Sequence, residues 1–347
     1  MVNGFECPIP ISDYDRITLA HGGGGRLTHR LISQLFLYLF DNEYLRPLHD
    51  GAVLEMDGKM AVSTDGFVVS PIFFPGGNIG DLAVNGTLND VAMCGAKPLY
   101  ITLGFILEEG FRLKDLWEIL VSIKKRSDEA GVKVITGDTK VVERSKGDGI
   151  YVHTTGFGRV LEGVEIGPHR VRPGDRIILS GPIAEHGIAI MSVREGLEFE
   201  TPLKSDTMNL WPLVESILKA GKEDVHMLRD ATRGGVASAL NEIAKSAGAG
   251  IVIREEEIPV RDEVRGACEI LGLDPLYVAN EGKFIAIVSP ERADELLDIL
   301  GGVLGGEEAR IIGEVVEESP GVVQMITAFG SRRVVDMLSG EQLPRIC

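Results

Sequence analysis

The sequence lacks the short motifs that identify the commonest nucleotide-binding and hydrolytic enzymes. No GxxxxGK(S/T) phosphate loop, GxGxxG fingerprint, HExxH zinc motif or GxSxG nucleophile elbow occurs in its 347 residues. Long apolar runs are also missing, since none approaches the ~20 residues that cross a membrane, and the first residues lack the basic start and apolar run of a signal peptide. We therefore expect a cytoplasmic protein without a membrane segment, whose chemistry uses a less common arrangement of residues.

Positive charge is scarce relative to negative charge. Lys and Arg together number 35 and Asp and Glu number 52, which gives a formal net charge of −17. A surface of this sign repels polyanions, and the chain has no basic run where phosphates could collect. This excludes nucleic acid as the main ligand. A nucleotide is still compatible, provided that divalent cations neutralise its phosphates and the protein's carboxylates.

Cysteine is rare, and the four cysteines lie too far apart in the sequence for a CxxC pair or a zinc knuckle. Cys7, Cys94 and Cys268 are interpreted as structural or incidental. Cys347 is the last residue and follows a segment with glycine, proline and no periodicity. Residues 338–347 are therefore predicted to form a mobile tail, which could carry the thiol over roughly 30 Å when extended. Taken alone, a terminal thiol is either such a carrier or an incidental exposed group.

Glycine, in contrast, is abundant, with 43 residues, about twice the average usage. Apolar spacings near one helical turn predict helices, and short or alternating apolar runs predict strands, in both halves of the chain. We predict an α+β protein built of two α/β sandwich domains. The expected domains are 1–168 and 169–337, followed by the tail 338–347. Helices are predicted over 26–41, 80–94, 113–130, 209–220, 236–247 and 292–300, a hairpin over 52–65 and a strand over 150–160.

The glycine run Gly22-Gly23-Gly24-Gly25 precedes the first predicted helix. Backbone without side chains can approach a phosphate closely, and a helix N-terminus adds about half a positive charge. This favours polyphosphate binding, although a flexible entry loop explains the same glycines. Further along, Thr136-Gly137-Asp138-Thr139-Lys140 ends a predicted strand and brings a carboxylate and an ammonium together. Lys140 could hold phosphate charge or polarise a carbonyl oxygen, or it is a surface lysine.

Four aspartates lie beside turns or strand ends, and carboxylates that share a cleft need a hard cation such as Mg²⁺ to offset their repulsion. A single aspartate at such a place is more often a turn former or a helix cap. On the predicted helix 80–94, Asp81, Asn85 and Asn89 share one face, which fits either a ligand-binding stripe or a solvated face. Asp90 lies on the opposite side from Asn85. The four aspartates are Asp50, Asp65, Asp90 and Asp230.

Several motifs together resemble a known superfamily. Residues 80–98 are similar to the signature helix of the superfamily containing aminoimidazole ribonucleotide synthetase, selenophosphate synthetase and thiamine monophosphate kinase. Their sequence is Gly80-Asp-Leu-Ala-Val-Asn-Gly-Thr-Leu-Asn-Asp-Val-Ala-Met-Cys-Gly-Ala-Lys-Pro98. The chain resembles the HypE family of NiFe-hydrogenase maturation factors nearly end to end. This resemblance to the HypE family rests on residues 21–26, 137–142, 229–235 and 280–282 and on the ending Pro344-Arg345-Ile346-Cys347. The ending is the most specific of these motifs.

The resemblance implies an ATP-dependent carbamoyl dehydratase that makes the cyanide ligand of a NiFe site. In this family the carbamoyltransferase HypF loads a carbamoyl group onto the terminal cysteine, ATP activates its oxygen as a phosphate, and loss of that phosphate leaves a thiocyanate. The HypC–HypD complex then receives the cyanide on iron. The resemblance also implies a homodimer, in which the first domains join their strands into a β-barrel with nucleotide sites near the interface.

The resemblance assigns Cys347 as the carrier, Glu281 as the general base and Lys140 as the electrostatic partner of the amide oxygen or the γ-phosphate. It places ATP at Gly22, Gly23, Gly24, Gly25, Asn85 and Asp138, and Mg²⁺ at Asp50, Asp65, Asp90 and Asp230. Two other interpretations stay open at this point. One is an ATP-dependent kinase or synthetase of the same superfamily that acts on a small molecule. The other is a nucleotide-binding scaffold whose tail docks a partner.

Overall fold

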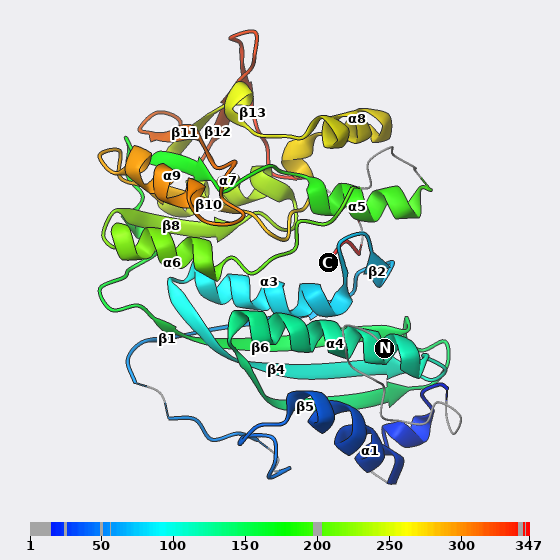
Figure 1. Cartoon of the computed structure of the whole chain (residues 1–347). Coiled ribbons are helices and arrows are strands. Elements are labelled where there is room, and N and C mark those ends of the chain that lie inside the picture. Colours follow the sequence, from blue (N-terminus) through cyan, green and yellow to red (C-terminus); the bar gives the residue numbers. More distant parts are fainter. Residues whose placement is uncertain are drawn as a thin grey trace.

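The computed structural model describes residues 15–23, 26–48, 51–55, 57–196, 203–338, 343 and 345–347. It shows two stacked sheet-and-helix units, with helix α3 (Ile79–Met93) between them (Figure 1). The α+β architecture of two α/β layers that the sequence predicted is confirmed. Among the described residues, no helix is both long and apolar enough to span a bilayer.

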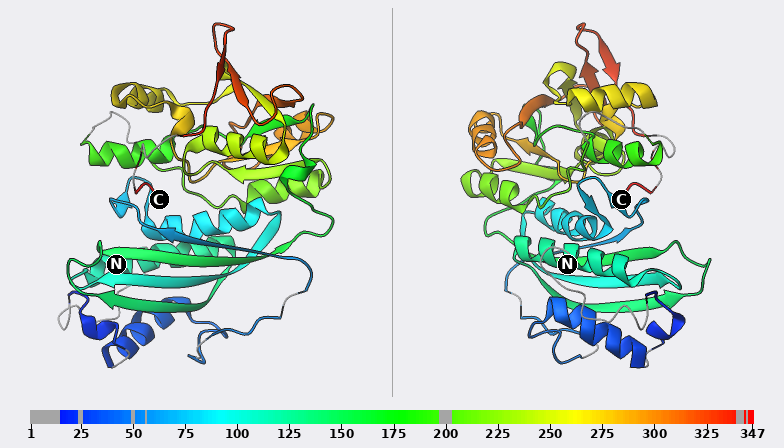
Figure 2. Two further views of the ribbon diagram at one scale, coloured as in Figure 1. Left: turned by 180° about the vertical axis from the view of Figure 1, so that it is seen from behind. Right: turned by 45° about the vertical axis from the view of Figure 1, so that its right-hand side comes forward.

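The first domain is built on a four-stranded sheet. Its strands are β1 (Met60–Phe67), β4 (Ala96–Glu108), β5 (Lys133–Val142) and β6 (Ile150–Val160), and a small hairpin is formed by β2 (Phe73–Phe74) and β3 (Gly77–Asn78). The strand order β1-β6-β4-β5 leaves β1 and β5 as the two edges. Helices α3 and α4 (Leu113–Ala130) pack together beside this sheet (Figure 2).

Helix α3 begins at a side-chain cap. Asn78 Oδ1 accepts a hydrogen bond from Gly80 N (2.8 Å), and Asp81 Oδ2 accepts one from Asn78 N (2.8 Å). Nearly every residue of α3 is buried, because one side packs on the first sheet and the other meets the second domain. Helix α4 ends just before Gly131, whose φ of 67° is the left-handed conformation that favours glycine.

The helix predicted over residues 26–41 is present but is not uniform. It runs as α1 (Arg26–Leu31), a π-helical turn (Ile32–Phe36) and α2 (Leu37–Phe40), next to the β5 edge of the sheet (Figure 1). The hairpin predicted over residues 52–65 is wrong. Residues 52–55 form no strand, and β1 pairs with β6, which lies far away in the sequence. The turn signal at Asp57-Gly58 is local, whereas the pairing of β1 depends on the whole sheet.

The second domain is built on a seven-stranded sheet. Its strands are β7 (Arg176–Leu179), β8 (Val225–Asp230), β9 (Gly250–Arg254), β10 (Phe284–Val288), β11 (Arg310–Val316), β12 (Val323–Ile326) and β13 (Arg332–Val334). Its helices are α5 (Glu185–Arg194), α6 (Trp211–Ala220), α7 (Gly235–Ala247), α8 (Asp262–Leu271) and α9 (Ala293–Gly301). The strand order is β13-β12-β9-β11-β7-β10-β8, and the β8 edge contacts α3 of the first domain. The predicted boundary at 168/169 falls in the connection between β6 and β7.

Candidate active site

The end of the chain docks between the two domains, close to α3, α5 and β2 (Figure 1). Residues 345–347 run alongside residues 68–70, because Val68 N donates to Cys347 O (3.3 Å) and Ser70 N donates to Arg345 O (3.1 Å). Ile346 is 4% exposed and packs against buried side chains of the first domain. The last three residues of the predicted mobile tail therefore have a defined docking place, which the sequence could not show.

The docked tail brings the Cys347 thiol close enough to the Glu281 carboxylate for the charge of Glu281 to act on the thiol. Cys347 is partly buried and lines a cavity of about 330 Å³ together with Asp65 and Arg233. Burial, followed by the charge of Glu281, raises the pKa of the Cys347 thiol far above its ordinary value. The docked sulfur is therefore a protonated thiol and a poor nucleophile.

Glu281 is buried, at 3% exposed. Burial, and then the nearby carboxylates of Asp206 and Asp230, raise the pKa of Glu281 well above its ordinary value. A carboxylate with a raised pKa is a stronger base than free glutamate. Gly86 of α3 leaves room for it, since a Cβ there would lie 3.0 Å from the Phe67 ring and 3.8 Å from Glu281 Oε2.

The loop that carries Glu281 is held by Asp206, a residue that the sequence analysis did not single out. Its carboxylate accepts hydrogen bonds from Glu281 N (3.0 Å), Gly282 N (3.1 Å) and Lys283 Nζ (3.2 Å). Burial raises the pKa of Asp206, but the charge of Lys283 and the hydrogen bonds that the carboxylate accepts outweigh it, so the pKa lies below its ordinary value. Gly282 has to be glycine, because a Cβ there would lie 1.8 Å from Asp206 O.

Three of the four predicted metal ligands converge next to Glu281. The pKa of Glu281 is raised by the carboxylates of Asp65 on β1, Asp90 on α3 and Asp230 at the end of β8. Asp90 and Asp230 also hydrogen bond to each other. Burial and then neighbouring carboxylates raise the pKa of Asp230 to about 7. Burial is also the main cause that raises the pKa of Asp90, which accepts a hydrogen bond from Ser63 (2.7 Å). The fourth predicted ligand, Asp50, lies outside the described residues.

These oxygen donors fit a hard divalent cation such as Mg²⁺, because carboxylates that raise one another's pKa values are stabilised by a shared positive charge. Within the described ranges, no three His, Cys, Asp or Glu side chains already form a cation site. A cation at this place would therefore have to draw the carboxylates of Asp65, Asp90 and Asp230 closer together.

A second group of predicted site residues gathers on the β5 edge of the first sheet. Lys140 Nζ pairs with Asp138 Oδ2 at 2.9 Å, and both side chains are mostly exposed. Gly22 lies against the same strand, where a Cβ would come within 2.7 Å of Val141 N. Gly23 follows it and is exposed, whereas Gly24 and Gly25 lie outside the described residues. Gly22, Asp138 and Lys140 thus lie together at the β5 edge, away from Glu281.

The sheet order explains this separation. Asp65 pairs with Thr154 on β6, which pairs with Leu103 on β4, whereas Asp138 pairs with the adjacent Gly104 of β4. Asp65 and Asp138 therefore lie at nearly the same height on opposite edges of the sheet. Three strand spacings separate them, or about 14 Å. Within a single chain, the residues at the β5 edge therefore lie apart from the residues around Glu281.

The polar stripe of α3 joins the two domains in this conformation. Asn85 is fully buried and donates to Thr207 Oγ1 (3.2 Å), and Asn89 donates to Met208 O (3.0 Å). The stripe therefore fastens the segment around Thr207 to α3 instead of facing solvent. Asn85 Oδ1 has no hydrogen-bond partner within the described part of the chain. The role of Asn85 in nucleotide binding stays a prediction.

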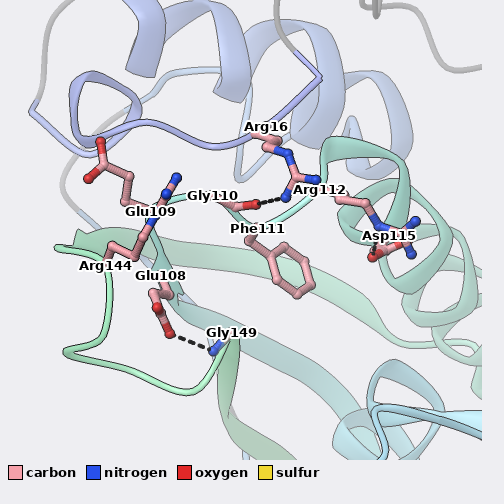
Figure 3. A pocket seen from close by; sticks show the side chains of 9 residues that line it. All are labelled: Arg16, Glu108, Glu109, Gly110, Phe111, Arg112, Asp115, Arg144 and Gly149. Atoms are coloured by element: carbon pink, nitrogen blue, oxygen red, sulfur yellow. Dashed lines mark hydrogen bonds and ion pairs between the residues drawn. The ribbon is translucent and has the colours of Figure 1, made fainter.

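A larger cavity of about 800 Å³ lies where β4 ends, next to the turn between β5 and β6 (Figure 3). Its lining includes Arg16, Arg112 and Arg144 together with Glu108 and Glu109. Arg112 pairs with Asp115, and Glu108 accepts hydrogen bonds from backbone amides of the turn. None of the predicted site residues lines this cavity.

The raised pKa of Asp230 gives a test of the carboxylate cluster. The folded-state pKa of about 7 lies above the ordinary value of 3.8. The contribution of Asp230 to the free energy of unfolding is therefore fully present below pH ~4 and is lost as the pH rises through ~7. Without divalent cations, the free energy of unfolding of Asp230→Asn relative to wild type should rise by ~4 kcal/mol between pH 4 and pH 8, because the wild type has to ionise a buried carboxyl group. Urea unfolding measures it, and Asp57→Asn, on an exposed turn, should show no such trend.

Comparison with known proteins assigns both units to one class. Residues 48–160 match the N-terminal domain of AIR synthase related proteins, and residues 172–326 match the C-terminal domain of the same proteins. The fold is therefore that of a two-domain protein of the AIR synthase related class, as the sequence predicted.

Closer relatives define the family within that class. Carbamoyl dehydratase HypE of Cupriavidus necator is 54% identical over 346 residues, which cover 99% of this chain and 98% of the relative. A hydrogenase maturation protein HypE solved in complex with ATP has a TM-score of 0.92 and 49% identity, covering 95% of this chain and 99% of its own. A structure of a HypE–HypF complex gives a TM-score of 0.79 at 46% identity over 89% of this chain and 99% of that chain. The chain belongs to the HypE family of carbamoyl dehydratases, which confirms the predicted resemblance.

Proposed function

We propose that this chain uses ATP to dehydrate a carbamoyl group on Cys347 to a thiocyanate during hydrogenase maturation. The observation that carries the proposal is the docked tail, which puts the carrier sulfur beside a buried carboxylate with a raised pKa. Relatives named carbamoyl dehydratase, and one related structure solved with ATP, support it. The S-carboxamide and ATP become S–C≡N, ADP and phosphate, and the carboxamide oxygen leaves in the phosphate.

The residue types at the site suit this chemistry. An amide oxygen is a poor leaving group, so its transfer to phosphate makes cleavage of the C–O bond feasible. Glu281 takes a proton from the carboxamide nitrogen, and its raised pKa makes it an effective base for that step. Burial of Glu281 and Ile346 also keeps bulk water away from the activated intermediate.

Loading of the tail has to take place away from Glu281. Only a thiolate attacks an electrophile well, and the docked Cys347 is held as a thiol. The tail therefore leaves its docking place to be carbamoylated. HypF is the proposed carbamoyltransferase, supported by the related HypE–HypF complex. The HypC–HypD complex is the proposed acceptor of the nitrile carbon.

The proposed assembly is a homodimer in the cytoplasm. One chain leaves both β1 and β5 unpaired at the edges of its sheet, and Met60 and Val62 of β1 are about half exposed. If the β1 edge of one chain meets the β5 edge of the other, two sheets close into a barrel and remove these edges. The partner's Lys140 then approaches the Asp65 and Glu281 side of this chain.

ATP and Mg²⁺ take their proposed places in this assembly. The exposed backbone of Gly23, with Lys140, offers donors to phosphate oxygens at the β5 edge. Asp65, Asp90 and Asp230 would hold Mg²⁺, which offsets the charge of the phosphates when bound. Lys140 is the group proposed to neutralise charge on the γ-phosphate or the amide oxygen.

The mass of the C-terminal peptide tests the proposed function. The full-length chain is first loaded by HypF and then incubated with ATP and Mg²⁺. We expect a carbamoyl adduct on the peptide that contains Cys347, followed by loss of one water after ATP is added. Cys347→Ala is the control and should carry no adduct. An adduct that ATP never changes would instead indicate a docking scaffold, and ATP-dependent phosphorylation of a small molecule by Cys347→Ala would indicate a kinase.

A further inference from the structure

Helix α5 receives the docked tail through three of its residues. The His186 ring nitrogen Nε2 lies 2.8 Å from Ile346 O, and Arg194 at the other end of α5 donates to Arg345 O. Gly187 leaves space first for Val278 and then for the tail, because a Cβ there would come 2.4 Å from Val278 Cγ1 and 3.3 Å from Leu343 Cδ1. The last residues of the chain therefore lie along this helix on one side and along residues 68–70 on the other.

The hydrogen bonds of His186 fix its protonation. Ile346 O can only accept, so Nε2 carries the hydrogen and donates it. Nδ1 is then unprotonated and accepts from the Ser205 hydroxyl at 2.8 Å. The ring is fully buried and meets the Phe74 ring edge to face. Burial is the main cause that lowers the pKa of His186, which agrees with a neutral imidazole.

The residue that orients His186 belongs to the segment that also fixes Glu281. Ser205 N donates to Pro75 O of the first domain (2.8 Å), which anchors the segment. The next residue, Asp206, accepts hydrogen bonds from Glu281 N and Gly282 N. Two neighbouring residues thus position the ring that holds the tail and the loop that carries the carboxylate.

We propose that His186 is a positioning residue for the dehydration, which holds the Ile346 carbonyl so that the sulfur of Cys347 stays next to Glu281. The inference rests on the proposed function for its catalytic consequence, but its structural part does not depend on it. When the tail leaves, the hydrogen bond between Nε2–H and the Ile346 carbonyl is lost, and a buried hydrogen bond of this kind stabilises the docked tail. His186 therefore favours the docked state.

The test compares two substitutions of His186 in the full-length chain. His186→Ala removes the donor, whereas His186→Gln places an amide nitrogen near the position of Nε2. We expect His186→Ala to load normally and to lose water from the carbamoyl group about 10- to 100-fold more slowly in a single turnover with ATP. His186→Gln should recover most of that rate. His226→Ala is the matched control, because His226 is a buried histidine of the same domain bonded to Asp175.

Amide hydrogen exchange provides a second measurement that needs no catalysis. Val68 N and Ser70 N donate to the docked tail, so both amides should exchange faster in His186→Ala and not in His226→Ala. Unchanged exchange and an unchanged rate in His186→Ala would overturn the proposal, as would a His186→Gln variant as slow as His186→Ala. If the wild type itself loses no water with ATP, the proposed function fails, while amide exchange still decides whether His186 holds the tail.

Discussion

Glu281→Gln is expected to accept the carbamoyl group from HypF at the normal rate and to lose water from it ~10²- to 10⁴-fold more slowly than the wild type. The side chain keeps its size and its place next to Cys347, but glutamine cannot take a proton from the carboxamide nitrogen. Single-turnover mass spectrometry of the C-terminal peptide measures both steps. The loaded intermediate should therefore accumulate in this variant when ATP is present.

The matched control for this experiment is Glu314→Gln. Glu314 lies on β11 and pairs with Arg176, away from the tail and the carboxylate cluster. Its substitution should leave both loading and dehydration unchanged. If Glu281→Gln dehydrates the carbamoyl group at the wild-type rate, a group other than Glu281 is the base.

Mixed dimers of Lys140→Ala and Glu281→Gln are expected to recover activity that neither variant has alone. Each parent dimer should be impaired at both sites, Lys140→Ala by ~10²- to 10³-fold. In a mixed dimer, one site combines the intact Glu281 of one chain with the intact Lys140 of the other. About half of the wild-type activity per dimer should return, since one of the two sites is complete. Two affinity tags allow the mixed dimer to be purified and its single-turnover rate measured.

The geometry behind this expectation is the position of the two groups on one sheet. Within one chain, Lys140 lies on the β5 edge of the first sheet, whereas Glu281 lies near Asp65 on the β1 edge. The β5 edge that can meet β1 is the one that a second copy offers. A mixed dimer carrying Glu281→Gln and Lys140→Ala on the same chain is the control, and it should stay impaired, because one of its sites lacks Glu281 and the other lacks Lys140. Activity of the first mixed dimer at the level of its impaired parents would place Lys140 and Glu281 of one site in the same chain.

The sequence predicted the elements whose signals are local. Helix 113–130 was predicted to its boundaries because an apolar face, a helix-forming interior and Gly131 all agree. Strand β6 was predicted over residues 150–160 from its short apolar pattern. Helix α5 was missed, because Gly187 and its β-branched residues weaken the helical signal and the helix depends on packing against the rest of the domain.

The candidate site was predictable where a motif contains the residue itself. Asp65, Asp90, Asp230 and Glu281 were named from their motifs, and the structure brings them together. Asp206 and His186 were not named, because each acts through a residue that is distant in the sequence and neither stands in a recognisable pattern. The sequence also gave no means to see that the Lys140 and Glu281 groups lie on opposite edges, since this follows from strand order.

The most direct test of the account follows the carboxamide oxygen. The carbamoyl group on Cys347 is prepared with oxygen-18, and a single turnover is run with ATP and Mg²⁺ in ordinary water. We predict that oxygen-18 appears in the inorganic phosphate while the C-terminal peptide loses one water. Oxygen-18 released into water, or kept on the peptide while ATP is hydrolysed, would contradict the account.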